Sequence, residues 1–172
     1  MNNNSFELLD RRVFPQHTDD MLPWMRKASS DDLANWIHND QNIFHKFAPT
    51  LSLLQATISK GDRSSVLLQC SLPENCKNIW GFARGGVICS AVDEASSLLA
   101  ALNVGPNQIG PTQSASFIFS AAVKTRKFFI TAKAINTSMS SVSISARVGS
   151  RRVNNHSSAL LVFSRRKKTS NG

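Results

Sequence analysis

The segment from Gly85 to Leu102 constrains the fold more than any other part of the chain. Its apolar residues fall within one arc of about 140° when the chain is wound at 100° per residue, which predicts an amphipathic helix. These residues are Val87, Ile88, Ala91, Val92, Ala95, Leu98, Leu99 and Leu102. The opposite face carries Asp93 and otherwise small side chains, unlike the lysines and glutamates of an ordinary solvated face. We therefore expect a central helix buried on both sides, under a sheet and near a second subunit.

Strand patterns surround this helix. Before it come an apolar stripe of helical period that ends near Phe47 and two expected strands, over residues 51–58 and 66–72. After it come four strand segments, at residues 112–119, 128–135, 141–148 and 159–163. This order predicts an α+β fold, a curved antiparallel sheet wrapped around one central long helix, with an N-terminal helix. The expected divisions are an N-terminal arm and short helix over 1–47, one domain over 48–164 and a basic tail over 165–172.

Charge is distributed unevenly along the 172 residues. Nine basic and all eleven acidic residues lie at or before Glu94, so that part has a net charge of −2. From Ala95 onward there are eleven Lys or Arg and no Asp or Glu, a net charge of +11. An acid-free half that still reads as folded favours an anionic partner, either phosphate groups on a small molecule or a nucleic acid.

Other sequence features exclude several classes of protein. No run of about 18 uninterrupted apolar residues is present, which argues against a membrane-spanning helix. Cys70, Cys76 and Cys89 are odd in number and lack zinc-type spacing, and the four histidines form no metal motif, so we expect free thiols, no metal and no cofactor. We expect a cytoplasmic protein, with the mitochondrial matrix as the alternative, because the acidic N-terminus resembles neither a secretion signal nor a transit peptide.

The segment from Asn78 to Asp93 carries the candidate chemistry. Gly85 and Gly86 open the helix, where the backbone approaches a ligand closely and the first N–H groups point outward at the positive end of the helix dipole. Such N–H groups suit an oxyanion or a thioester carbonyl. Asp93 lies two turns further along, where a carboxylate would act as a base or a nucleophile.

This combination resembles the hotdog-fold thioesterases, particularly the phenylacetate-pathway and acyl-CoA thioesterase branch. That pattern has an Asn six positions before the His of a His-Gly-Gly, and an acid nine residues after the His. Asn78 stands at the Asn position, Gly85-Gly86 at the paired glycines and Asp93 at the acid. The order of elements from Leu51 to Phe163 also matches. The resemblance therefore implies a hotdog fold and an acyl-CoA thioesterase that works as a dimer or a dimer of dimers.

The resemblance also implies roles for the residues. Gly85 N–H and the Asn78 side chain would polarise the thioester carbonyl, and Asp93 of the partner subunit would activate water or attack directly. Thr112 or Ser114 would orient that water. Gly86 and Trp80 are further candidates for contacting the substrate, Trp80 as part of the acyl pocket. Lys and Arg side chains would meet the phosphates of CoA.

Residue 84 departs from the pattern, because Arg84 replaces the His. An arginine does not act as a base, although the backbone donor of Gly85 survives the change. Arg84 would pair with Asp93, occupy the acyl pocket or clamp a phosphate. The rival function is therefore a catalytically impaired hotdog protein that binds RNA, a ribonucleoprotein or a CoA ester. No known RNA-binding motif supports the RNA alternative, and tyrosine is absent.

Overall fold

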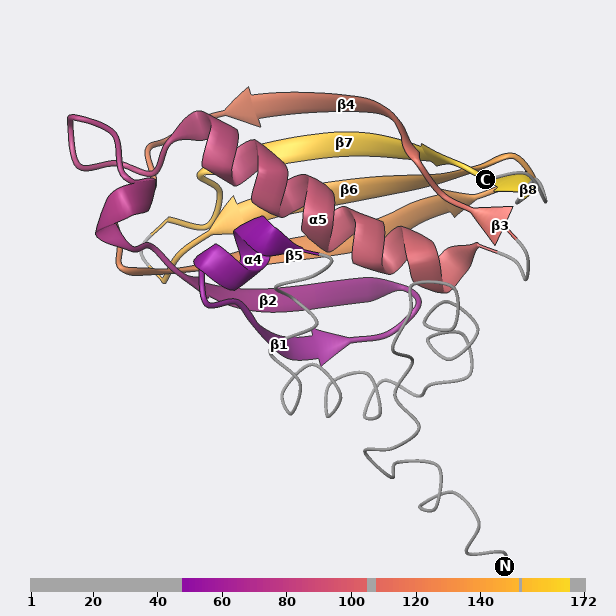
Figure 1. Cartoon of the computed structure of the whole chain (residues 1–172), viewed down its shortest axis with the longest axis horizontal. Helices are drawn as coiled ribbons and strands as arrows, with labels where there is room; N and C mark the ends of the chain where they lie inside the picture. Colours follow the sequence, from indigo (N-terminus) through magenta and orange to yellow (C-terminus); the bar gives the residue numbers. More distant parts are fainter. Residues whose placement is uncertain (1–47, 105–107, 152, 168–172) are drawn as a thin grey trace, which may run out of the picture.

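A curved antiparallel sheet with one long helix across it forms the body of the protein (Figure 1). The computed structural model describes residues 48–104, 108–151 and 153–167. Within these residues the sheet has six strands in the order β1-β2-β5-β6-β7-β4, and α5 (Gly85–Asn103) lies against one of its faces. The strands are β1 (Thr57–Gly61), β2 (Ser65–Ser71), β4 (Thr112–Phe119), β5 (Lys127–Thr137), β6 (Ser141–Gly149) and β7 (Ser157–Ser164). The predicted architecture is confirmed, and the sheet is open rather than a closed barrel.

The core lies between α5 and the concave face of the sheet. Alternate residues of β5 and β6 are fully buried there, including Phe128, Ile130 and Ile144. On α5, six of the eight residues in the predicted apolar arc are buried, and Val87 and Leu98 are partly buried. By length and composition α5 also resembles a membrane-crossing helix, but it packs on the sheet as the central helix of this core.

The small-residue side of α5 is covered only in part. Ser96 and Ala100 are buried, whereas Cys89 and Asp93 are half-buried and Ser90 is exposed. The expectation of a helix buried on both sides thus holds for one end of this face within a single chain. The other end, from Ser90 to Asp93, remains accessible.

The prediction of a strand over residues 51–58 was wrong for the first half of that segment. Pro49–Leu53 forms a short helix, α4, and the strand β1 begins only at Thr57. Pro49 stands in the first helical turn, where its fixed φ favours a helix. Both carboxylate oxygens of Glu94 accept hydrogen bonds from α4, from the N–H of Thr50 at 3.0 Å and of Leu51 at 2.8 Å. A residue more than 40 positions away thus stabilises the helix.

Three short elements complete the described part of the chain, and one of them corrects the expected basic tail. A short 3-10 helix, η3 (Glu74–Cys76), precedes the loop that leads into α5. Arg166–Lys167, expected in a tail that leaves the fold, form β8 and pair antiparallel with β3 (Gln108–Ile109), because this pairing satisfies their backbone groups. The predicted N-terminal helix and arm lie outside the described residues.

Candidate functional site

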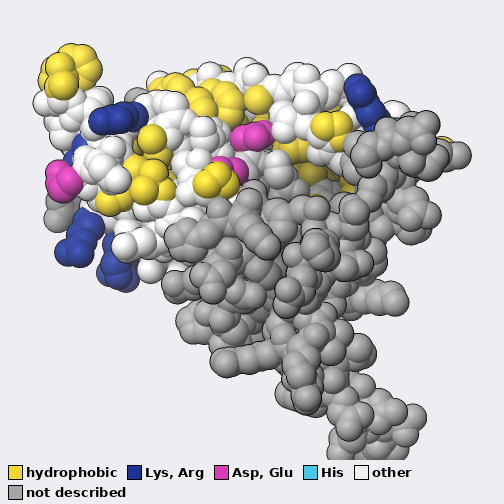
Figure 2. All heavy atoms as spheres, viewed as in Figure 1, with side chains coloured by type: hydrophobic (Ala, Val, Ile, Leu, Met, Phe, Trp, Pro, Cys, Tyr) yellow, Lys and Arg dark blue, Asp and Glu magenta, His cyan; other side chains and the backbone are white. Residues whose placement is uncertain are grey.

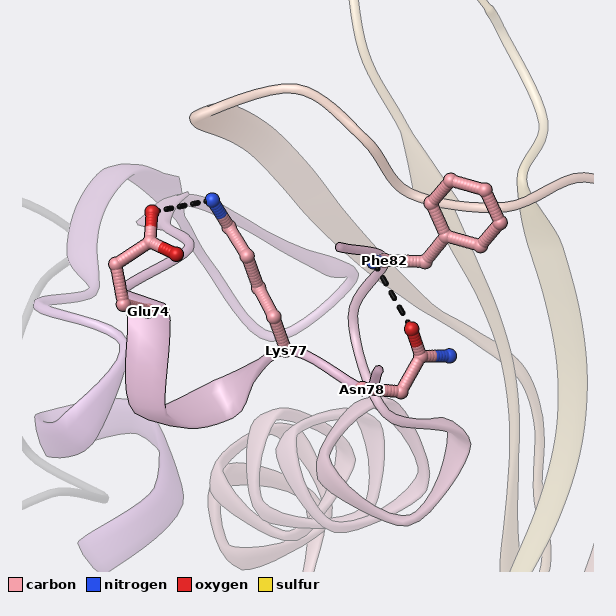
Figure 3. Close-up of polar contacts among 4 residues, drawn as sticks. All are labelled: Glu74, Lys77, Asn78 and Phe82. Atoms are coloured by element: carbon pink, nitrogen blue, oxygen red, sulfur yellow. Dashed lines mark hydrogen bonds and ion pairs between the residues drawn. The ribbon is translucent and has the colours of Figure 1, made fainter. Parts of the chain in front are cut away.

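The loop between η3 and α5 is held in shape by Asn78. Its side-chain oxygen accepts hydrogen bonds from the N–H groups of Trp80 at 3.0 Å and Phe82 at 3.1 Å, and Gly81 turns the chain with a φ of 77°. Figure 3 shows the oxygen turned toward Phe82 and the amide nitrogen directed away from it. Because both contacts are N–H donors, the oxygen is committed to the loop. The Nδ2 group is the part of Asn78 that remains to donate to a ligand.

This loop carries an exposed apolar tip. Ile79 is 90% exposed and Trp80 is 71% exposed. Figure 2 shows hydrophobic side chains projecting at this corner of the molecule. Trp80, predicted to contact the acyl group, does not line the pocket described below. Within one chain it therefore points into solvent.

The N-terminus of α5 presents unused backbone donors. Arg84 is the N-cap in an extended conformation and provides no side-chain cap. Within the described residues, the N–H groups of Gly85 and Gly86 make no hydrogen bond, and both glycines are exposed. Free N–H groups at the positive end of a 19-residue helix are suited to a carbonyl oxygen that gains negative charge.

Arg84 is held against its own loop. Its Nε donates to the carbonyl oxygen of Lys77 at 2.9 Å. Among the described residues it forms no ion pair with Asp93, which lies more than two helical turns further along α5. Of the three outcomes considered for Arg84, pairing with the Asp93 of its own chain does not occur.

A pocket of about 330 Å³ opens beside Gly85 and Asn78. Its lining residues come from the loop, from α5, from the end of β4, from the segment after it and from the start of β7: Asn78, Phe82, Ala83, Gly85, Ile88, Phe119, Ser120, Ala121, Ala122, Val123 and Ser157. Except at the two serines and Asn78, the lining side chains are apolar, which suits an acyl group. Gly86 and Arg84 do not line it.

Phe82 and Phe119 are pocket residues that the sequence did not predict. Phe119 lies at the end of β4, where its ring would contact any side chain added at Gly85, at 3.7 Å from a Cβ there. The strand register pairs Phe119 with Ser157, a buried position of β7, which places Phe119 on the inner face. The contact between the strand end and the helix start was not readable from periodicity.

Asp93 and Thr112 form a second group. The Thr112 hydroxyl donates to the Asp93 Oδ1 at 3.0 Å. Of the two candidates for orienting water, Thr112 is therefore the one in contact with the acid. The pairing of β4 with β7 is irregular between Thr112 and Ser114, and this places Ser114 opposite Val162, on the face away from α5. Acidic side chains are visible near the middle of α5 in Figure 2.

One chain holds these groups apart. Gly85 and Asp93 are eight positions apart on one helix, so the rise of about 1.5 Å per residue separates them by about 12 Å. A carbonyl oxygen bound at the Gly85 N–H is therefore beyond the reach of the Asp93 of its own chain. The structure brings together Gly85 with Asn78, and Asp93 with Thr112, as two half-sites.

The cysteines and possible metal ligands add nothing to either half-site. Burial raises the pKa of the Cys89 thiol, and it raises that of Cys76 although the charge of Arg84 opposes the shift. Burial raises the pKa of Cys70 to about 12. These groups are neutral thiols near pH 7 rather than nucleophilic thiolates. In the described segments, His, Cys, Asp and Glu form no group that would hold a metal ion.

Comparisons with known proteins show which family and which solved structures this chain is similar to. The family model of the thioesterase superfamily matches residues 81–152, a range that includes Gly85, Asp93 and Thr112 but not Asn78. A hypothetical thioesterase from Streptococcus pneumoniae, solved with coenzyme A, is 18% identical, with a TM-score of 0.63 and coverage of 74% of this chain and 99% of that chain. Comparison with the sequences of curated proteins gives no significant match.

Two further structures show the same fold. A phenylacetic acid degradation-related putative thioesterase from Ralstonia eutropha is 12% identical, with a TM-score of 0.63 and coverage of 68% of this chain and 89% of that chain. A Streptococcus mutans protein bound to acetyl CoA is 16% identical, with a TM-score of 0.60 and coverage of 67% and 91%. The likeness at these identities is one of fold.

Proposed function

Because the chain belongs to the thioesterase superfamily and has its hotdog fold, we propose that it is an acyl-CoA thioesterase, hydrolysing a CoA thioester to a carboxylic acid and free CoA. The observation that carries the proposal is the pair of half-sites on α5. Unused N–H donors and an apolar pocket lie at its N-terminus, and a threonine-bound carboxylate lies two turns away.

The complete site requires a second copy of the chain. Among the described residues, β4 is an edge strand that pairs only with β7 and is exposed along seven of its eight residues. An exposed strand edge is a template for pairing with another chain. If two copies pair through β4 about a two-fold axis, their α5 helices run side by side in opposite directions. The N-terminus of one helix then lies beside the middle of the other, which brings Asp93 of the partner subunit toward Gly85.

The chemistry follows from these positions. The thioester carbonyl oxygen accepts from the Gly85 N–H, with Gly86 N–H and Asn78 Nδ2 as neighbouring donors. Asp93 of the partner subunit takes a proton from a water molecule, whose oxygen forms a bond to the carbonyl carbon. The tetrahedral oxyanion is stabilised at the helix N-terminus, the C–S bond breaks, and the CoA sulfur leaves and takes up the proton. Thr112 occupies one carboxylate oxygen and so orients the other toward the water.

Arg84 has no acid–base role in this scheme. Its guanidinium is exposed next to the pocket and bound to the Lys77 carbonyl, a position from which it would contact a phosphate of CoA at the pocket mouth. The replacement of the expected His by Arg84 also supports the second candidate, a protein that binds CoA esters without hydrolysing them. Turnover separates the two candidates, because both require CoA-ester binding.

Hydrolysis is tested on a panel of aryl- and acyl-CoA esters by release of the CoA thiol. We expect turnover by the native chain and a loss of 10²-fold or more in kcat for Asp93→Asn, which keeps the side-chain shape but removes the base. Asp62→Asn is the matched control, because Asp62 is bound to Ser64 in the β1–β2 turn. The thioesterase proposal is wrong if the native chain turns over no ester or if Asp93→Asn retains full activity.

A further inference from the structure

The face of the sheet that points away from α5 has its own organisation. On β5 the side chains of Phe128, Ile130 and Ala132 are buried under α5, so Phe129, Thr131 and Lys133 alternate onto the opposite face. The strand register sets Thr131 directly opposite Arg147 of β6, and Lys133 opposite Ser145. α4 and α5 both lie on the other side, as Figure 1 shows for α5.

Two open hollows lie on this outer face and meet at Phe129. The first, of about 500 Å³, is lined by Phe129, Thr131, Lys133, Ile135, Ser145 and Arg147, with the turn after β6. The second, of about 440 Å³, is lined by Gln69, Thr125, Arg126, Lys127, Phe129 and Arg151. Since both include Phe129, they adjoin at that residue, and we refer to the two hollows together as the track. From Lys127 to Lys133 the track extends about 20 Å along β5, at about 3.4 Å per residue.

The track is cationic and lacks internal neutralisation. Five cations line it: Arg126, Lys127, Lys133, Arg147 and Arg151. None of them forms an ion pair with another described residue, and none of the four described acids lines either hollow. All five cations come from the acid-free part of the chain after Glu94, so the fold gathers part of its positive charge on one surface. Because these charges have no counter-charge in the part of the chain that the structure describes, this face favours an anionic occupant.

We infer that this track binds single-stranded nucleic acid. A flexible polyanion would follow the line of cations with its phosphates, and Phe129, partly exposed where the hollows meet, offers a surface for base stacking. This proposal is separate from ester hydrolysis, since no residue of either half-site lines the track. Five cations in two joined hollows favour a polymer over one CoA molecule. A second copy packed on this face would bring two sets of uncompensated cations together.

The experiment measures fluorescence anisotropy of a labelled uridine 20-mer with the full chain between 50 and 300 mM KCl. Five phosphate contacts predict a slope of log K against log salt near −3.5. The double variant Lys133→Gln/Arg147→Gln should reduce the slope magnitude by about 1.4 and weaken binding at least tenfold at 0.1 M salt. Phe129→Leu should weaken binding by about tenfold with the slope unchanged, because it removes stacking and no charge.

The matched control is Lys77→Gln/Lys124→Gln, which removes the same net charge and should change affinity less than twofold. Both lysines lie near the loop that precedes α5, since Lys77 pairs with Glu74 and the Lys124 Nζ lies 4.6 Å from the centre of the Phe82 ring. Thermal unfolding of each variant checks that it is folded.

The inference is overturned if the 20-mer does not bind, if both double variants weaken its binding equally, or if CoA at millimolar concentration displaces it. Equal affinity for a duplex would also overturn it, since a rigid helix does not stack a base on Phe129. Ester turnover of Lys133→Gln/Arg147→Gln should match the native chain, so this test is independent of the thioesterase test.

Discussion

The side chains of Asn78 and Arg84 both form hydrogen bonds with the backbone of the loop before α5. The Asn78 oxygen holds the loop, so only its amide nitrogen is left for a ligand. The Arg84 guanidinium binds the Lys77 carbonyl, so the residue that departs from the expected motif does not neutralise the Asp93 of its own chain. A change of His to Arg at this position therefore removes an acid–base group while leaving the backbone donor and the carboxylate in place.

His156 is the residue whose titration should affect stability. It is 2% exposed, with its Nε2 3.0 Å from the Ser150 hydroxyl, and burial lowers its pKa below the usual 6.5. Above pH 6.5 the ring is neutral in both the folded and the unfolded chain. As the pH falls below 6.5 the unfolded chain binds a proton that the folded chain does not, so the free energy of unfolding decreases until the pH reaches the lowered pKa.

We expect the free energy of unfolding, measured by urea denaturation, to fall more between pH 7.5 and 5.5 for the native chain than for His156→Gln. The other three histidines are present in both proteins, so the difference between the two pH profiles reports His156 alone. Asp62, whose pKa is lowered mainly by the Ser64 hydroxyl, loses its contribution only at more acidic pH. Parallel profiles for the two proteins would contradict this account of His156.

At the scale of elements, α4 depends on a contact from α5. Its five residues are too few to form a stable helix in isolation. Its first N–H groups are satisfied by Glu94, which stands next to the candidate catalytic Asp93 but points toward α4. Two adjacent acids on α5 therefore have different tasks, one structural and one proposed to be catalytic.

Glu94→Ala tests this coupling. It leaves two backbone N–H groups without their charged acceptor, so we expect a loss of about 2 kcal/mol in the free energy of unfolding. Glu74→Ala is the control, since Glu74 is exposed and pairs with Lys77 on the surface (Figure 3), and it should cost less than about 0.5 kcal/mol. Equal losses from the two variants in denaturant titrations would refute the capping role.

Elements set by local patterns were predictable, and elements set by distant contacts were not. The periodicity of α5 and the alternation of β6 identified both from sequence, because each buries one face along its whole length. The apolar residues of α4 favour a strand in the sequence, because the contact that stabilises the helix comes from the distant Glu94. The sequence does not distinguish Thr112 from Ser114 as the partner of Asp93, because an irregularity in the β4–β7 pairing decides which of the two side chains faces the helix. The outer-face track needed the strand register to show that its cations meet.

At the scale of the whole molecule, the two faces of the sheet carry the two proposed activities, and each proposal gives its face a different partner. The helix side carries the half-sites and the open edge of β4, which the thioesterase proposal completes with a second copy. The outer face carries the cationic track. Because the sheet separates these surfaces, a dimer formed through β4 would leave the track accessible and extend the sheet on which it lies.

Subunit mixing tests whether each site is shared between chains. Asp93→Asn removes the carboxylate, and Gly85→Pro removes the N–H at the first helical position, where proline is tolerated. Arg84 is already extended, as a residue before proline prefers, and an added Cβ at Gly85 makes only ordinary contact with Phe119. Each variant alone should be inactive.

In a refolded equimolar mixture, half of the dimers are mixed and each mixed dimer holds one intact site, with Gly85 from one chain and Asp93 from the other. We expect the mixture to recover about a quarter of the native turnover per chain, since one site in four is complete. If Gly85 and Asp93 of the same chain acted together, no dimer would contain an intact site and the mixture would stay inactive. Recovered turnover therefore requires that the 12 Å separation along α5 is bridged by a partner helix.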